Sequence, residues 1–230
     1  MKEQNLILQM INMQQSLNDA TAGVGWESGY ANNGKLISWR RCIYMECAEL
    51  IDSFAWKHWK NVNAEADREN ILIEIVDIWH FVLSLMLAQY HLRGLTDPVR
   101  LANDIASSRD FSTFCKEPRD ISSENMYEIL NDIEKLIHEC SGFSFDVFAI
   151  LHSYFTVALK CGVNLEKLFN GYIGKNVLNA FRQKHGYKDG TYIKVWGDKE
   201  DNEVLSQILA TKPASLEQIY SKLESLYPGK

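Results

Sequence analysis

Two apolar segments of the chain each carry a pair of acidic residues three positions apart. Glu46 and Glu49 lie in the first segment, and Glu74 and Asp77 lie in the second. Residues three apart share one face of an α-helix, so the side chains of each pair can converge on one point. Acids among Ile, Val, Leu, Trp and Phe are costly to bury unless they are paired or bind a metal. The pattern therefore predicts two packed helices that form a four-carboxylate cage.

An all-oxygen cage of this kind suits a hard divalent cation, above all Mg²⁺. A solvated helix face is the alternative for either pair alone, because Glu-x-x-Glu is a common pattern. Two copies on neighbouring apolar helices count against that alternative. The second helix is apolar at most of its other positions, so it has little surface that could face solvent. Asp52 and His80 lie six positions after the first acid of each segment. Either could support the ligands or contact a substrate, and a buried core histidine is an equally good interpretation of His80.

The rest of the chain is also predicted to be helical. Only four prolines occur in 230 residues, and long runs repeat their apolar positions with the helical period. Caps and glycines place helices at about 2–20, 38–59, 67–94, 97–115, 122–142, 146–162 and 164–186, with two more from 201 and 215. The Asp189-Gly190 turn signal predicts a short hairpin or an ordered loop near residues 187–197. We therefore expect an all-α fold, a compact multi-helix bundle of about eight to nine helices in a single domain, residues 1–230, with a helical insert near 95–120.

Charge and cysteine usage narrow the classes of function. A net charge of −6 and a pI near 5.5 argue against non-specific binding of nucleic acid or a membrane surface, and point to small-molecule chemistry. Five cysteines without a C-x-x-C spacing favour a reducing, cytoplasmic location. The N-terminal residues lack the features of a signal peptide. The longest apolar stretch contains Glu74, Asp77 and His80, so it predicts a buried core helix and not a membrane span.

A cationic stripe follows on a later helix. Lys175, Asn179 and Arg182 are spaced i, i+4 and i+7, so two cations flank an amide on one helix face. This arrangement fits a phosphate chain and one metal contact, although taken alone such a stripe is more often a solvated helix face. Lysines continue into residues 187–202, a segment that could close over phosphates as a lid.

Two further groups could contact a nucleoside. Trp56 could stack on a base while Lys57 or Lys60 approaches phosphates, and the alternative is an ordinary lysine-rich helix end. Gln14 and Asn18 are amides four residues apart that could bind the edge of a base, although surface amides at this spacing are common.

With these residues in view, the chain closely resembles the dimeric deoxyuridine triphosphatases of the all-α nucleotide pyrophosphohydrolase superfamily. The matching stretches are residues 38–60, 74–81, 174–192 and 200–205. The resemblance implies a homodimer that hydrolyses dUTP, and also dUDP, to dUMP, releasing pyrophosphate from dUTP. Such an enzyme limits uracil in DNA and supplies dUMP for thymidylate synthesis.

The matching motifs also imply residue roles. Ligands for more than one Mg²⁺ per site, with Mn²⁺ as a substitute, would be Glu46, Glu49, Glu74, Asp77 and Asn179. Phosphate and lid contacts would be Lys60, Lys175, Arg182, Tyr187, Lys194 and Asn202. The nucleoside pocket would be Gln14, Asn18, Trp56 and His80. Glu49 is our choice for the carboxylate that orients or deprotonates the attacking water, which by family analogy attacks the β-phosphorus.

Three alternatives stay open at this point. The same chemistry on dCTP or another deoxynucleotide would differ only in the base pocket. A di-iron carboxylate oxidoreductase is suggested by Asp77-x-x-His80, but such bundles need a second Glu-x-x-His, where the partner helix offers Glu49-x-x-Asp52. The third alternative is a helical dimerisation protein without catalytic activity.

Overall fold

The computed structural model of the chain describes residues 2–61, 63–118 and 120–229. Within these residues it has ten α-helices and one two-stranded antiparallel sheet, which confirms the all-α class. The helices are α1 Lys2–Thr21, α2 Trp39–Asp52, α3 Arg68–Leu92, α4 Pro98–Ala106, α5 Phe111–Phe114, α6 Met126–Ser141, α7 Val147–Lys160, α8 Leu165–Lys184, α9 Asp201–Ala210 and α10 Leu216–Leu226. The strands are β1 Val195–Trp196 and β2 Lys199–Glu200, and short 3-10 turns are η1 Trp26–Ser28 and η2 Ile121–Ser123.

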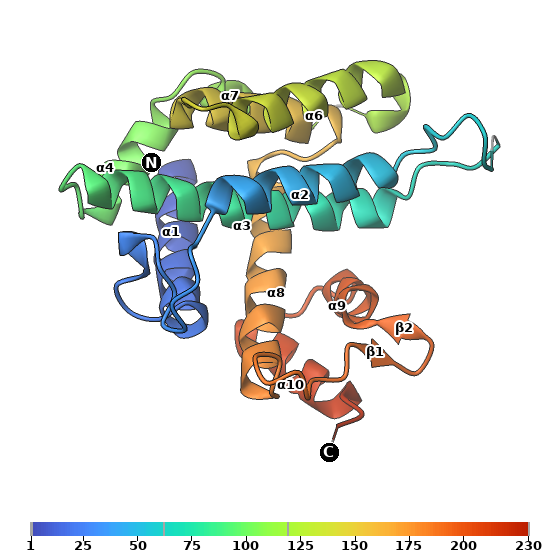
Figure 1. Cartoon of the computed structure of the whole chain (residues 1–230). Coiled ribbons are helices and arrows are strands. Elements are labelled where there is room, and N and C mark those ends of the chain that lie inside the picture. Colours follow the sequence, from blue (N-terminus) through green and yellow to red (C-terminus); the bar gives the residue numbers. More distant parts are fainter. Residues whose placement is uncertain (1, 62, 119, 230) are drawn as a thin grey trace.

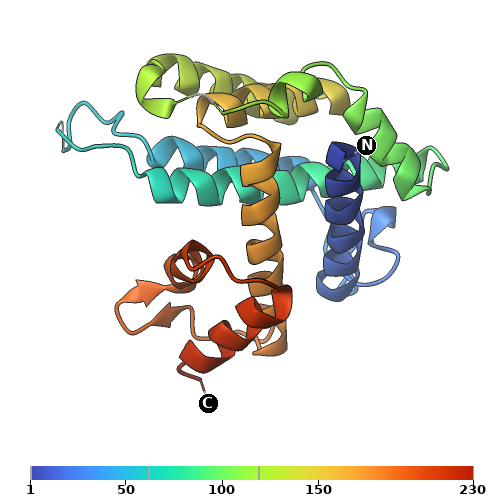
Figure 2. The ribbon, with the colours of Figure 1, turned by 180° about the vertical axis from the view of Figure 1, so that it is seen from behind.

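The helices are arranged around an antiparallel pair at the centre. Helices α2 and α3 lie side by side across the middle of the molecule, and α6 and α7 cover one side of this pair (Figure 1). Helices α1 and α8 extend from the opposite side, and α9, α10 and the small sheet gather near the far end of α8 (Figures 1 and 2). This arrangement places α8 and the C-terminal elements on the side of α2 and α3 that α6 and α7 leave uncovered.

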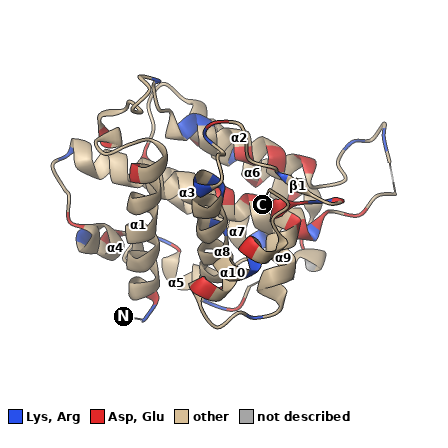
Figure 3. Ribbon diagram, turned by 90° about the horizontal axis from the view of Figure 1, so that it is seen from below, with Lys and Arg blue, Asp and Glu red and all other residues tan. Residues whose placement is uncertain are grey.

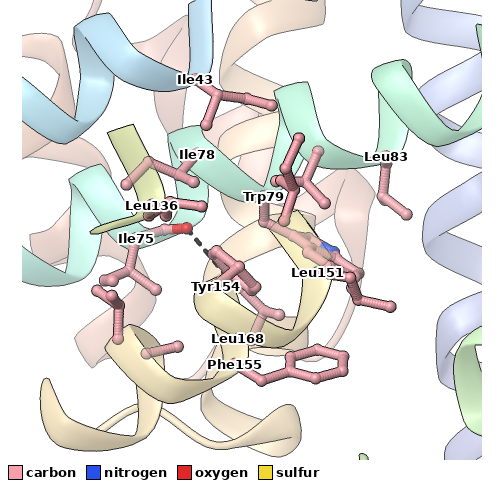
Figure 4. Packing of buried hydrophobic residues seen from close by; sticks show 14 of the residues in the cluster. Ile43, Ile75, Ile78, Trp79, Leu83, Leu136, Leu151, Tyr154, Phe155 and Leu168 are labelled. Atoms are coloured by element: carbon pink, nitrogen blue, oxygen red, sulfur yellow. Dashed lines mark hydrogen bonds between the residues drawn. The ribbon is translucent and has the colours of Figure 1, made fainter. Parts of the chain in front are cut away.

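Helix α3 is the axis of the main hydrophobic core. Among the described residues it is the one helix long and apolar enough by itself to cross a membrane, but it is mostly buried inside the protein. Trp79 of α3 stacks on Tyr154 of α7 with ring centroids 5.1 Å apart. The Tyr154 hydroxyl donates to the Ile75 carbonyl at 3.1 Å (Figure 4). The apolar sequence of α3 is therefore that of a core helix, as the sequence predicts.

Two glycines of α8 allow close contact with neighbouring helices. A Cβ atom added at Gly171 would lie 2.9 Å from the Val76 side chain of α3. A Cβ atom added at Gly174 would lie 2.7 Å from the Leu209 side chain of α9. Both distances are too short for a real side chain, so α8 depends on glycine to approach α3 and α9. This close approach brings the cationic residues of α8 to the acidic residues of α3.

A second hydrophobic cluster fixes the C-terminal elements on α8. Leu178, Phe181 and Leu223 are fully buried in it, and Trp196 and Tyr227 complete its aromatic part. Because residues of α8, α9, α10 and the sheet all contribute, the cluster holds the segment after Lys184 in place next to the cationic stripe.

The helix predicted to run to about Trp59 instead ends at Asp52. Phe54, just past this helix end, packs into the core and is 5% exposed. The Ser53 hydroxyl donates to the Glu49 carbonyl and accepts from Asn70, and the Ser53 carbonyl accepts from the Asp67 amide. These bonds satisfy the helix end locally. Trp56, Lys57 and Lys60 consequently lie in a loop.

Two other boundaries differ from the prediction. The helix expected at 97–115 is broken between α4 and α5, where the Ser108 hydroxyl bonds to the Ile105 carbonyl and Asp110 adopts a left-handed φ of 67°. This break accounts for the tenth helix. Asp189 and Gly190 do form a turn, but the strands lie further along, at 195–196 and 199–200, and are joined across Gly197, whose φ is 72°.

Candidate active site

Carboxylates of α2 and α3 meet where the two helices pack together. Glu46, Glu74 and Asp77 each bring one oxygen to within 4.8 Å of the others. Glu74 is 6% exposed, and its Oε2 atom has no hydrogen-bond partner among the described residues. Glu49 is exposed beside them, and its charge acts on Glu46 and Glu74. The predicted cage therefore has three members close together and the fourth at its edge.

Burial and mutual repulsion make these acids difficult to ionise. Burial, followed by the negative charges of Asp77 and Glu74, raises the pKa of Glu46 well above its usual range. Burial and the charge of Asp77 also raise the pKa of Glu74. A divalent cation would relieve this repulsion and give Glu74 Oε2 a partner. The oxygen-only donor set therefore fits a hard divalent metal ion.

Lys175 of α8 lies directly against the acidic group. Its Nζ donates to Asp77 Oδ2 at 2.7 Å and to Asn202 Oδ1 at 2.8 Å. The lysine is 5% exposed, and a buried ammonium of this kind is stable only when paired. Seen from the side on which α8 projects, acidic segments of α2 and cationic segments of α8 lie in the same central region (Figure 3). The structure thus brings together both halves of the predicted polar site.

Arg182 lies two turns further along α8 and is also paired. Its Nε and Nη2 atoms donate to the two carboxylate oxygens of Asp201, each at 2.8 Å. Its Nη1 donates to Asn179 Oδ1 at 3.2 Å, so the predicted partners Asn179 and Arg182 are in contact. The Tyr187 ring lies over the guanidinium, 5.6 Å from Cζ. The predicted cations therefore form one network with residues at the start of α9.

The predicted nucleoside residues of α1 and α3 form a buried polar network. Gln14 Nε2 donates to Asn18 Oδ1 at 2.9 Å and to Ser84 Oγ at 3.0 Å, while Gln14 Oε1 accepts from the Tyr172 hydroxyl at 2.9 Å. His80 Nδ1 lies 2.7 Å from Gln14 Oε1 and donates to it. Burial lowers the pKa of His80 to about 3, so the ring is neutral. Both amides are 2% exposed, which makes them internal groups and not surface amides.

The side chains of the other predicted contacts form no hydrogen bond to these networks among the described residues. Trp56 Nε1 donates to Asp52 Oδ1 at 3.2 Å, and the Trp56 ring packs against Trp59 at 5.4 Å between centroids. Lys60 is exposed in the same loop, and Lys194 pairs with Glu200 at 2.9 Å. Trp56 lies beyond the ends of α2 and α3, whereas His80 lies about three turns inside α3. Within one chain the contacts of the described residues do not connect Trp56 with the amide network.

The comparison with known families decides between the alternatives. A family model described as dUTPase matches residues 6–187, which is most of the chain. The chain belongs to the dUTPase family. It is accordingly a dUTP diphosphatase whose substrate is a nucleotide, and the family uses a divalent metal, for which Glu46, Glu74 and Asp77 are suitable ligands. No curated protein matches the chain.

Family membership removes the reason for the di-iron and non-catalytic alternatives. The geometry agrees, because the His80 ring bonds to Gln14 and not to the carboxylate group. Three residues of these networks, Ser84, Tyr172 and Asp201, were not singled out from the sequence. Tyr172 reads as one more apolar residue of α8, and Asp201 reads as a helix start, because an acid in the first turn usually only complements the helix dipole.

Proposed function

We propose that the chain hydrolyses dUTP, and also dUDP, to dUMP in the presence of Mg²⁺. The observation that carries this proposal is the pairing of an acidic group with a cationic one. Oxygens of Glu46, Glu74 and Asp77 lie within 4.8 Å of one another. Lys175 Nζ lies 2.7 Å from Asp77 Oδ2. A metal–polyphosphate complex needs carboxylates for the metal and cations for the phosphates, and this site offers both.

Glu46, Glu74 and Asp77 would hold Mg²⁺, with Glu49 and Asn179 as further oxygen ligands at the edge. Mg²⁺ bound there would neutralise the charge that develops on the phosphate oxygens. The number of candidate oxygens supports more than one ion per site, and Mn²⁺ would substitute because it accepts the same ligands. The unpartnered Oε2 of Glu74 supports this assignment, since a buried carboxylate oxygen is normally bonded.

Glu49 is best placed to handle the attacking water, because it is exposed beside the buried carboxylates. It would orient or deprotonate a water for in-line attack on the β-phosphorus. The bond from that phosphorus to the oxygen shared with the α-phosphate would break, so dUMP leaves with that oxygen. The products would be pyrophosphate from dUTP and phosphate from dUDP, which explains the use of both substrates.

Lys175, Arg182 and Asn202 would contact the phosphates together with Tyr187 and Lys194. Lys175 and Arg182 are held by internal acceptors in the structure. A phosphate oxygen would therefore add to or exchange with an existing bond. Residues 187–202 carry Tyr187 and Lys194 and would cover the phosphates as a lid.

The base would bind at the network of Gln14, Asn18 and His80. These side chains are neutral and buried and bond to one another, so the uracil edge would exchange with some of these internal bonds, and the amino group of cytosine would be left unpaired. A preference for dCTP or another deoxynucleotide is the second possibility, and it would be decided at this network.

We further propose that the enzyme is a homodimer. The segment 56–61 extends past the ends of α2 and α3 (Figure 1), and Trp59 in it is 63% exposed. An aromatic residue on a projecting segment is typical of a surface that another chain covers. Sedimentation of the wild-type protein and of Trp59→Ser tests this, and a monomer at all concentrations for both proteins would reject it.

The function is tested with a panel of dUTP, dUDP, dCTP, dTTP and dATP plus Mg²⁺, scored for monophosphate, phosphate and pyrophosphate. We expect turnover of dUTP and dUDP, and loss of turnover in Glu49→Gln. Absence of dUTP turnover by the folded wild-type protein would reject the proposal. Faster turnover of dCTP than of dUTP would support the alternative, in which dCTP is the preferred substrate. Stoichiometric iron in protein purified without chelator would reject the assignment of Mg²⁺ as the metal of this site.

A further inference from the structure

Asp201 stands at the point where the C-terminal elements meet the cations of α8. It is the first residue of α9 and lies outside the matched range 6–187. It is also completely buried, with 0% of its surface exposed. A fully buried carboxylate is retained only if its oxygens are bonded, so its partners indicate its role.

Both Asp201 oxygens are used to bind Arg182. Nε of Arg182 donates to Oδ2 and Nη2 donates to Oδ1, each at 2.8 Å. This two-point contact fixes the plane of the guanidinium as well as its position. Burial by itself raises the pKa of the Asp201 carboxyl, but the hydrogen bonds and charge of Arg182 outweigh burial and hold the pKa below its usual value. Asp201 is therefore ionised at neutral pH.

The same residue also ties down the segment before α9. The Tyr192 hydroxyl donates to Asp201 Oδ2 at 2.8 Å, and the Asp201 amide donates to the Lys194 carbonyl at 3.0 Å. Because residues 187–202 include the proposed phosphate contacts Tyr187 and Lys194, Asp201 joins that segment to Arg182 on α8.

The two-point contact determines which edge of Arg182 stays available. A guanidinium has five N–H donors. Those on Nε and Nη2 are directed to Asp201 and Asn202, and one on Nη1 is directed to Asn179. The second Nη1 donor has no bond partner among the described residues, and the Tyr187 ring covers one face of the group. The donor left for a phosphate oxygen is therefore on the edge beside Asn179.

We infer that Asp201 is a positioning residue for nucleotide hydrolysis: it aims the Nη1 edge of Arg182 at the phosphates and fixes the 187–202 segment over them. This inference rests on the proposed function, because it takes Arg182 to be a phosphate contact. Asp201 itself touches no substrate and acts through Arg182 and Tyr192.

The test compares Asp201→Asn with two controls. Asp97→Asn makes the same chemical change at an exposed N-cap of α4 outside the site, where Asn caps the helix equally well, and Tyr192→Phe removes the Tyr192 bond to Asp201. For each protein we would measure kcat and KM for dUTP, and calorimetric binding of pyrophosphate with Mg²⁺, below the melting temperature. We expect Asp201→Asn to lower kcat/KM about 10- to 100-fold, as loss of a positioning contact does, with Asp97→Asn unchanged.

Chemical rescue separates positioning from a merely structural role. Arg182→Ala leaves the Asp201 carboxylate facing a space the size of the lost side chain, so millimolar guanidinium should bind there and restore part of the activity and of the pyrophosphate affinity. The double variant Arg182→Ala/Asp201→Asn should not respond, because the group that orients guanidinium is missing. Equal rescue in both, or a wild-type kcat/KM in Asp201→Asn, would overturn the inference.

If Asp201→Asn does not fold, Asp201→Glu keeps the charge but moves it by one methylene, and wild-type activity there would overturn the inference. Failure of the proposed function would be seen as no dUTP turnover by the wild-type protein. Failure of the Asp201 inference would be seen when each variant is compared with the wild-type protein in kcat/KM and in pyrophosphate affinity. The pyrophosphate affinity can be compared even if no protein turns over dUTP.

Discussion

Replacing Glu74 by Gln removes one charge from the acidic group while keeping the shape of the side chain. In the metal-free protein, oxygens of Glu46, Glu74 and Asp77 lie within 4.8 Å of one another. Two unit charges at that distance repel by about 3 kcal/mol at an effective dielectric constant of about 20. Lys175, bonded to Asp77 at 2.7 Å, and solvent reaching Glu46 offset part of this. We therefore expect Glu74→Gln to stabilise the metal-free protein by about 1–2 kcal/mol at pH 8.

The assay is thermal unfolding at pH 8 in EDTA and again in excess Mg²⁺. For a chain of this length, about 1–2 kcal/mol corresponds to a melting temperature about 2–8 °C above wild type in EDTA. In Mg²⁺ at about 100 times its Kd, the wild-type protein should gain about 2.7 kcal/mol through binding. Glu74→Gln should gain much less, and its dUTP turnover should fall by about 10²-fold or more.

Glu134→Gln is the matched control, because Glu134 is exposed on α6 and lies outside the acidic group. It should melt like the wild-type protein in both buffers and keep full activity. The reasoning would be refuted if Glu74→Gln melted at or below wild type in EDTA, or if it kept the full Mg²⁺ shift. Either result would mean that Glu74 is not under electrostatic strain or is not a ligand.

Three other perturbations test separate parts of the structure. Glu49→Gln should lower kcat by about 10²- to 10⁴-fold, with a melting temperature in EDTA no lower than wild type, since Glu49 is exposed and its charge only adds to the repulsion on Glu46 and Glu74; a normal kcat would remove its role as base. The pKa of Asp201 is held below its usual value, so its stabilisation is complete above the unfolded pKa of about 4 and is lost as pH falls through the lower folded value. The free energy of unfolding measured from pH 6 to pH 2 should therefore depend less on pH in Asp201→Asn than in the wild-type protein. The same dependence on pH in both proteins would contradict the ion pair with Arg182. Gly174→Ala should cost about 1–3 kcal/mol in urea unfolding by overpacking against Leu209, which lies 2.7 Å from the added Cβ; no loss would mean that the Leu209 side chain can move away freely.

Helix positions and the acidic pattern followed from local rules. Spacing of apolar residues, caps such as Asp67 and Asp97, and glycines after helix ends depend on neighbours within one or two turns. The same short-range logic placed Glu74 and Asp77 on one buried face of α3, where the structure has them. It failed at Ser53, because the helix end there depends on bonds to Asp67 and to Asn70, which is seventeen positions away.

The sequence by itself determined the all-α class, the acid pairs at i and i+3, and the cationic stripe on one face of α8, because each of these is a consequence of helical periodicity. Only the tertiary structure decided which acids meet and which charges pair. Glu49 lies at the edge of the group, Lys175 faces Asp77, and Arg182 is held by Asp201 of another helix. These contacts depend on how closely α8 can approach α3 and α9, which is set by packing at Gly171 and Gly174 and not by any local pattern.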